Sequence, residues 1–345
     1  MVPTAMRRWT TLVPVLSLLY LTAHFAPAGA STGDSATSFS GRGTAVSATL
    51  LGTTTTLADT GPLPSSGGAE QASLLTATVP GTLTADVLHA TTVGIGSRSS
   101  SEASLADLSL NAAGNSVTAD FLMSRATAMC SSGQASASGS SEIAALAVNG
   151  QSVVVSTAPN QHIALPGGGN IAINEQQISQ NGNSASVTVN ALHVVIPGVA
   201  DIVVASAHSD ISCQGQSGCT SANDFVTGGG WITGTPSSAR ANFGVGGGTK
   251  NGSLWGHLVY IDHGPGGPTV KGTGVTAYSA TNATTRHIEG TAEVNGKGGF
   301  TYSIDVADYG EPGVNNDTFA LKLSNGYSAS GPLQGGNIEI HKPCA

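Results

Sequence analysis

The segment Cys213–Ile232, CQGQSGCTSANDFVTGGGWI, divides the chain into two stretches of different composition. Residues 31–212 contain almost no aromatic side chains and no lysine, whereas all five lysines and two of the three tryptophans lie after Gly230. A change of composition at a short polar segment is typical of a boundary between domains. We therefore predict two domains, residues 39–213 and 224–345, joined by a hinge at residues 214–223.

Charged residues are scarce throughout the chain. They make up 9% of the sequence, and the net charge is -8, whereas a typical soluble protein has roughly 25% charged residues. Binding to nucleic acid requires clustered lysine and arginine, which this sequence does not provide. Nucleic acid is therefore excluded as an expected partner.

The first thirty residues have the three parts of a secretory signal. Arg7 and Arg8 are the basic part, Thr11–Phe25 is a short apolar part, and Ala28-Gly29-Ala30 fits the cleavage rule. We expect cleavage after Ala30, a secreted, extracellular protein and no membrane span in the mature chain. An uncleaved N-terminal anchor is the alternative.

Export would place the four cysteines in an oxidising compartment, where three pairings are open to them. We favour one disulfide between Cys130 and Cys213 and another between Cys219 and Cys344. The alternative joins Cys213 to Cys219 and Cys130 to Cys344. Zinc is not expected, because no two cysteines have the C-x-x-C spacing.

Short apolar runs alternate with turn clusters over residues 39–213, which is typical of strands. The segment TADVL at 84–88 returns as TADFL at 118–122 and TVNAL at 188–192, so one hairpin unit is used several times. Asn149-Gly150 has the composition of a hairpin turn. The many small side chains predict that two sheets approach closely.

Residues 224–345 supply aromatic residues for a core that the first domain lacks. Strands are predicted at residues 254–260, 269–278, 286–294, 300–306, 318–323 and 337–341. Asn295-Gly296 and Asn325-Gly326 are predicted hairpin turns, and Gly244–Lys250 is predicted to be a loop. The expected fold class is all-β, with two antiparallel sandwich-like or barrel-like domains after a cleaved signal peptide.

Several local motifs occur together in each predicted domain. In the first they are Gly61–Pro64 (GPLP), Leu83–Leu88 (LTADVL), Ala126–Cys130 (ATAMC), Val148–Gly150 (VNG), Ile173–Gln176 (INEQ), Val189–His193 (VNALH) and Val204–Ser209 (VASAHS). In the second they are Val226–Ile232 (VTGGGWI), Ala241–Gly244 (ANFG), Gly290–Gly296 (GTAEVNG), Phe300–Tyr302 (FTY), Asp317–Phe319 (DTF) and Gly335–Lys342 (GGNIEIHK). Through these motifs the first domain resembles the choice-of-anchor P family, and the second resembles the post-choice-of-anchor (post-COAP) domain.

This resemblance covers almost all of the mature chain, and it implies a secreted, non-catalytic protein of the bacterial cell-surface type. Members of such families are tied to the envelope by C-terminal signals. The present sequence ends at Glu339–Ala345 without an apolar tail or an L-P-x-T-G motif, so we expect free secretion. Glycans or proteins of the cell envelope or matrix are the expected partners.

The densest group of oxygen ligands is the acidic segment DVADYGEPGVNND at residues 305–317. Asp305, Asp308 and Asp317 are candidate ligands of a calcium ion, together with Glu311, Asn315 and Asn316, because calcium takes six to eight oxygens. Their spacing matches no EF-hand loop, and a solvated acidic hairpin is the alternative reading. No other cofactor is expected.

Two further features could carry function. His257, Asp262 and His263 could supply metal ligands or an acid–base pair, although a straight strand would place the two histidines about 20 Å apart. Trp231 and Trp255 could stack on a sugar ring if they are exposed, but tryptophan is more often part of a core. His287 and His341 are weaker candidates of the same kind.

No motif for nucleophilic catalysis is present, since G-x-S-x-G does not occur. We therefore expect a secreted structural or interaction protein without enzymatic activity. A module that binds a glycan or calcium through the second domain is the alternative. A hydrolase would need a cleft that joins a histidine, an acid and a serine or metal.

Overall fold

The computed structural model describes residues 37–213, 224–250 and 252–342. Over these ranges every regular element is a strand and none is a helix, and the paired strands are antiparallel. The strands form three sheets in sandwich-like and half-barrel arrangements, so the all-β prediction is confirmed. All the described residues belong to one compact unit.

Sheets 1 and 2 are built from residues 38–212. Sheet 1 has the order β10-β11-β12-β13-β1-β2, and sheet 2 has the order β3-β4-β5-β6-β8-β9, with β7 also paired to β6. The strands are β1 (Ser38–Leu50), β2 (Thr53–Asp59), β3 (Gly68–Val79), β4 (Leu83–Ile95), β5 (Arg98–Ala112), β6 (Asn115–Ser131), β7 (Gln134–Ala144), β8 (Ala147–Val148), β9 (Gln151–Ser152), β10 (Gln161–Ala164), β11 (Asn170–Asn181), β12 (Ser184–Ile196) and β13 (Ala200–Ser212).

Sheets 1 and 2 pack face to face around one core of aliphatic side chains and alanines. Glycines in β1 allow the two sheets to approach closely. A Cβ atom on Gly43 would lie 2.6 Å from the carbonyl oxygen of Glu102, which is closer than real Cβ atoms come. The prediction of a close approach between two sheets is therefore confirmed.

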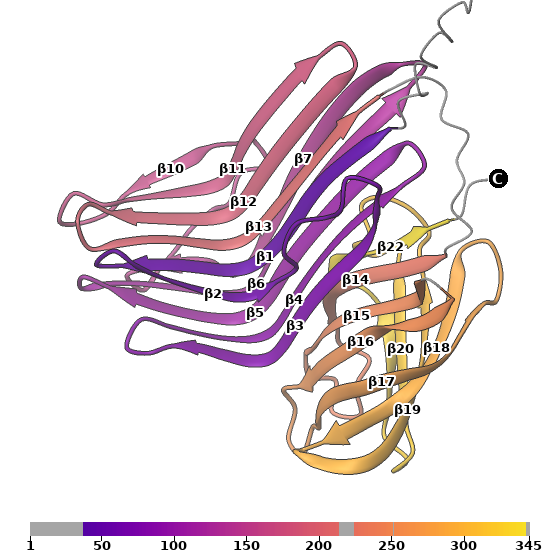
Figure 1. The fold of residues 1–345 in the computed structure, drawn as a ribbon. Helices are drawn as coiled ribbons and strands as arrows, with labels where there is room; N and C mark the ends of the chain where they lie inside the picture. Colours follow the sequence, from indigo (N-terminus) through magenta and orange to yellow (C-terminus); the bar gives the residue numbers. More distant parts are fainter. Residues whose placement is uncertain (1–36, 214–223, 251, 343–345) are drawn as a thin grey trace, which may run out of the picture. The chain divides into compact units, whose positions relative to one another are not determined.

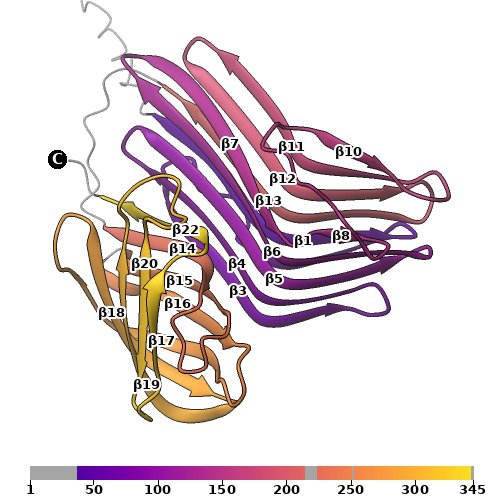
Figure 2. The same cartoon turned by 180° about the vertical axis from the view of Figure 1, so that it is seen from behind.

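A row of residues with left-handed backbone conformation crosses both sheets at one level. In sheet 1 they are Ala58, Asn174 and Ala205, and in sheet 2 they are Val87, Asp107 and Ala145. Positive φ is costly for a residue with a Cβ atom, and bulges with this conformation bend a strand. The long strands change direction part-way along their length (Figure 1 and Figure 2).

The partial sequence repeat marks this bend. Its three copies lie in β4, β6 and β12, at the level where the left-handed residues cross the sheets. The residues at this level are Asp86-Val87, Asp120-Phe121 and Asn190-Ala191. The repeated unit is therefore the stretch of strand that crosses the bend.

Sheet 3 is built from residues 225–341 in the order β21-β20-β19-β18-β17-β16-β15-β14-β22. The strands are β14 (Phe225–Ile232), β15 (Ala241–Lys250), β16 (Ser253–Asp262), β17 (Thr269–Ala280), β18 (Thr285–Val294), β19 (Lys297–Ala307), β20 (Thr318–Leu323), β21 (Ser328–Pro332) and β22 (Gly335–His341). Phe243 of β15 stacks on Phe319 of β20 with ring centroids 4.0 Å apart, although four strands separate them in the sheet. Sheet 3 therefore curls around its own aromatic core.

Most local predictions for residues 224–345 are confirmed. All six predicted strands are present, at β16, β17, β18, β19, β20 and β22. The Asn295-Gly296 turn joins β18 to β19, and both residues have positive φ. Asn149-Gly150 does the same between β8 and β9, and Asn325-Gly326 lies between β20 and β21.

One local prediction is wrong. Gly244–Lys250 is not a loop but most of β15, a strand inside sheet 3 with neighbours on both sides. Glycine weakens an isolated strand, but it is used where another backbone or side chain approaches closely. The close approach lies between sheet 3 and sheet 2, as described below.

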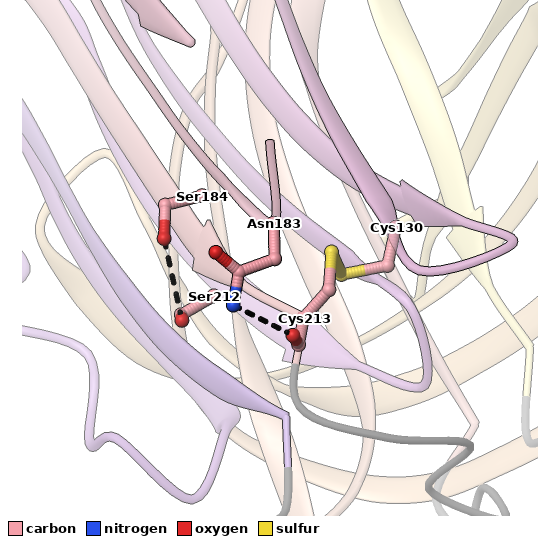
Figure 3. The surroundings of a disulfide bond; sticks show 5 residues. All are labelled: Cys130, Asn183, Ser184, Ser212 and Cys213. Carbon is pink, nitrogen blue, oxygen red and sulfur yellow. Dashed lines mark hydrogen bonds between the residues drawn. A yellow bond between two sulfur atoms is a disulfide. The ribbon is translucent and has the colours of Figure 1, made fainter. Parts of the chain in front are cut away.

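A disulfide joins Cys130, at the end of β6, to Cys213, directly after β13 (Figure 3). It therefore links the ends of a strand in sheet 2 and a strand in sheet 1. The backbone amide of Cys213 donates to the carbonyl oxygen of Asn183 at 2.7 Å, and the Asn183 side chain donates back to the carbonyl oxygen of Cys213 at 3.2 Å. This half of the favoured pairing is confirmed, while Cys219 and Cys344 lie outside the described residues.

Candidate functional site

One face of sheet 3 packs against the outer face of sheet 2. The residues on this face alternate along β14, β15, β16 and β22, as the strand register requires. Val259 and Ile261 of β16 pack on Val87 and Ala106 of sheet 2. The same face also carries glycine, histidine, glutamate and asparagine, so the interface between sheets 2 and 3 is part apolar and part polar.

Two glycines set the distance between these sheets. A Cβ atom on Gly229 would lie 2.4 Å from Oγ of Ser104, and one on Gly244 would lie 2.7 Å from Cβ of His89. The glycine-rich strands β14 and β15 are therefore contact surfaces.

The centre of the interface holds a buried histidine, His89, and a half-buried one, His257. Nδ1 of His89 lies 2.8 Å from Nε2 of His257, and Nδ1 of His257 is hydrogen-bonded to Oε1 of Gln71. Because the glutamine oxygen can only accept, His257 donates from Nδ1. Burial lowers the pKa of His257 to about 4 and that of His89 well below its usual value, which favours two neutral rings. In that state His89 donates from Nδ1 to Nε2 of His257.

His263 does not join His257, and Asp262 joins neither of them. The Asp262 carboxylate accepts hydrogen bonds from the hydroxyl of Tyr327 and the amide of Gly264, both at 2.8 Å. His263 instead contacts Asp107 of sheet 2, with 3.2 Å between Nδ1 and Oδ2. The three candidates from the segment HLVYIDH, His257, Asp262 and His263, therefore do not form one site.

Asp86, Asp107 and His263 form one group that could hold a metal ion, with their ligand atoms within 4.8 Å of one another. The bulges at Val87 and Asp107 place both carboxylates here. Arg240 already forms ion pairs with Asp107 and, at 2.8 Å, with Asp120. A guanidinium group thus provides the positive charge that a metal ion would bring.

The carboxylates of the acidic segment fasten a loop to β22. Asp317 is fully buried and accepts from the amides of Tyr309 and Ile338, each at 2.9 Å. Asp308 accepts from the amide of Ile340 at 2.9 Å, whereas Asp305 is paired with His287 at 2.7 Å on the surface. Within the described ranges, no three of these carboxylates come within 4.8 Å of one another.

The two tryptophans outside the leader are both partly covered by other residues. Trp255 is half-buried and makes an edge contact with Phe225, with ring centroids 5.4 Å apart. Trp231 is half-buried, and a Cβ atom on Gly335 would lie 2.2 Å from its Nε1. Phe225 and Trp255 pack with Ala69 and Val93 of sheet 2, so they belong to the interface and not to the core of sheet 3.

A pocket of about 460 Å³ opens where β22 and the loop after β19 meet the outer face of sheet 2. Two sets of residues that lie opposite one another on neighbouring strands of sheet 2 line it. One set is Glu102, Arg125 and Ser140, and the other is Thr127 and Ser138. The opposite wall comes from Glu311, Pro312, Asn337 and Glu339. Residues far apart in the sequence thus form one polar pocket.

Ion pairs and one amide organise this pocket. Arg125 binds Glu311 at 2.7 Å, and Arg98 binds Glu339 at 2.8 Å. The Asn337 amide nitrogen donates to Oε1 of Glu311 at 2.9 Å and to Oε1 of Glu102 at 3.2 Å. Both arginines therefore have a carboxylate partner in the pocket wall.

Glu102 is the unusual group of the pocket. It is 2% exposed, and its Oε2 has no hydrogen-bond partner within the described part of the chain. Burial raises the pKa of Glu102 well above its usual value, and the nearby charges of Glu339 and Glu311 raise it further. Relative to an exposed glutamate, the protonated form of Glu102, which can donate a hydrogen bond, is therefore favoured.

Sequence reasoning missed Glu102, Arg125, His89 and Asn337. The only available signal was compositional, since a charged residue is rare in this chain and Glu102 follows Arg98 and three serines in one strand. The sequence around Glu102 does not show that a second sheet covers the strand face that carries it.

Comparisons with known proteins do not assign the chain to a family. No family model matches it, and no curated protein matches it. One solved structure, a putative AttH from Nitrosomonas europaea, is similar over 96% of this chain and 99% of its own, with 10% sequence identity and a TM-score of 0.18. Likeness at this level carries no argument about function.

Within residues 37–213, 224–250 and 252–342, no helix is long and apolar enough to span a membrane.

Proposed function

We propose that this chain is an exported, non-catalytic protein that acts outside the cell in a structural or interaction role. The observation that carries the proposal is the disulfide between Cys130 and Cys213. Structural disulfides persist in oxidising compartments and are rare in the cytosol. The leader-like residues 1–30 and the resemblance to choice-of-anchor P and post-COAP domains point the same way.

The polar interface between sheets 2 and 3 also supports a structural role. His257, the candidate for acid–base chemistry, is half-buried and hydrogen-bonded to the buried His89. Asp317, the candidate calcium ligand with the greatest burial, holds two backbone amides. The histidine pair joins sheet 2 to sheet 3, and Asp317 holds a loop against β22 within the sheet 3 part of the chain. The pocket beside them is where an interaction with a small ligand would occur.

Export can be tested by expressing the full chain in a bacterial host that secretes proteins. We expect the protein in the culture medium, beginning at Ser31 by mass spectrometry, with Cys130 and Cys213 joined in a peptide map. A protein that stays inside the cell with residues 1–30 attached and both thiols reduced would overturn the proposal.

A further inference from the structure

The pocket lined by Glu102, Arg125 and Glu311 has the properties of a binding site. Its volume of about 460 Å³ lies within the range of roughly 300–1,000 Å³ that is usual for small-molecule sites. Such sites combine apolar walls with a few fixed polar groups. They also occur preferentially where two parts of a fold meet, as sheets 2 and 3 do here.

The charges in the pocket are already balanced. Arg98 and Arg125 are paired with Glu339 and Glu311 through contacts of 2.8 and 2.7 Å. Burial and the charges of Glu339 and Glu311 raise the pKa of Glu102, although Arg125 and the hydrogen bond from Asn337 act in the opposite direction. An ionic ligand would have to break one of these pairs, whereas a neutral polar ligand would not.

The groups without partners are neutral donors and acceptors. Within residues 37–213, 224–250 and 252–342, Oε2 of the buried Glu102 has no hydrogen-bond partner, while Oε1 accepts from Asn337. The hydroxyl groups of Ser138 and Ser140 also lack hydrogen-bond partners among the described residues, and both residues line the pocket. A buried polar atom without a partner is costly, and this cost applies to Oε2 of Glu102, whereas Ser138 is exposed and Ser140 is half-buried. A ligand with hydroxyl groups could bond to all three residues together.

The pocket also has apolar walls. Met129, which is 40% exposed, and Pro312 both line it. Such side chains suit the C–H faces of a sugar ring, whereas the ring hydroxyls both donate and accept hydrogen bonds. The volume is sufficient for one or two sugar rings.

We propose that the pocket between sheets 2 and 3 binds a neutral mono- or disaccharide through Glu102, Ser138 and Ser140, with Met129 and Pro312 against the ring. The proposal specifies a ligand for the interaction role proposed above. It depends on that role only for where the sugar comes from, outside the cell. It places glycan binding away from Trp231 and Trp255.

The test uses the full mature chain with its disulfide intact. Saturation-transfer NMR is recorded with glucose, galactose, mannose, N-acetylglucosamine, maltose, lactose and cellobiose at millimolar concentration, and positive sugars are titrated. We expect at least one sugar to bind. Ser138→Trp, which fills the pocket from an exposed strand position, should weaken binding by about tenfold or more.

Three further variants and one further ligand serve as controls and distinguish the other possible outcomes. Ser279→Trp, at an exposed position of β17 outside the pocket, should bind like the parent protein. Glu102→Gln keeps the size of the side chain but cannot carry a negative charge, so it distinguishes a neutral ligand from a cation. Ser140→Leu serves as the filling variant if Ser138→Trp unfolds. Ethanolamine is the probe for a cation-binding pocket.

The outcomes separate the possibilities. Binding that Ser138→Trp or Ser140→Leu removes and Ser279→Trp retains would support the proposal. The absence of binding by all seven sugars would overturn it, as would equal binding by the filling variant and the parent. Binding of ethanolamine that Glu102→Gln abolishes would also overturn it, because the carboxyl group would then act as an anion. None of these results alters the export test.

Discussion

Nδ1 of His89 lies 2.8 Å from Nε2 of His257, although 168 residues separate them in the sequence. The pair joins β4 of sheet 2 to β16 of sheet 3, with His89 buried and His257 half-buried. The hydrogen bond requires an acceptor nitrogen on at least one ring, so it cannot persist when both imidazoles are charged, because each ring would then donate from both nitrogens.

The histidine pair should make stability fall in acid. The pKa of His257 is about 4 in the folded protein and 6.5 in the unfolded chain, so the unfolded chain binds more protons between these values. His257 therefore contributes stability that is present above pH 6.5 and is lost as the pH falls to about 4. The loss is on the order of 3 kcal/mol for this residue.

This effect can be measured by urea unfolding at pH 7.5, 6.5, 5.5 and 4.5. Glu102 and Asp317 act in the opposite direction, since burial raises both pKa values, so variants must be compared with the parent protein. His257→Gln should lose less stability than the parent on acidification. His162→Gln, at an exposed position, should follow the parent. Parallel pH curves for the parent and His257→Gln would contradict the assignment.

Gly244→Ala should destabilise the protein by about 1–3 kcal/mol, because its Cβ atom would overlap that of His89 across the interface. Gly298→Ala is the matched control, since Gly298 has no atom within 4 Å of an added Cβ. Chemical denaturation of the two variants measures the difference. If both variants unfold at the same denaturant concentration, sheets 2 and 3 do not pack at the distance described here.

Removal of the disulfide by Cys130→Ser together with Cys213→Ser should cost about 4 kcal/mol, since the bond closes a long loop in the unfolded chain. The sequence separation of the two cysteines is 83. Urea unfolding of this double variant, beside the parent with and without reductant, gives the cost. An unchanged midpoint in both comparisons would show that the bond does not stabilise the fold.

Asp317→Ala should be far more damaging than Asp305→Ala. Asp317 is buried, and its loss leaves the amides of Tyr309 and Ile338 without an acceptor, which costs about 1–3 kcal/mol for each buried group. Asp305 forms an exposed pair with His287, and such pairs contribute at most about 1 kcal/mol. Thermal unfolding of both variants measures the contrast.

The same samples test calcium at the acidic segment. Because Asp308 and Asp317 already accept hydrogen bonds from backbone amides, we expect millimolar calcium to leave the melting temperature of the parent unchanged. A ligand specific for the folded state would raise it. A rise that the combined variant Asp305→Ala, Asp308→Ala and Asp317→Ala abolishes would restore the calcium site.

The strands and turns were predictable because their signals are local. Asn295-Gly296 and Asn149-Gly150 have positive φ at both residues, which this pair tolerates better than most others. The glycine-rich strand Ala241–Lys250 was not predictable. Its strand propensity is low, and its conformation depends on neighbours on both sides and on contact with His89.

The sequence by itself determined the all-β class, six strands of sheet 3, three hairpin turns and the favoured pairing of Cys130 with Cys213. Only the tertiary structure decided which polar residues are buried together. Alternation along a strand shows which side chains share a face, but it does not show whether that face meets water or a second sheet. Glu102 lies beside Asn337, 235 positions away, because both faces of sheet 2 are covered in this part of the fold.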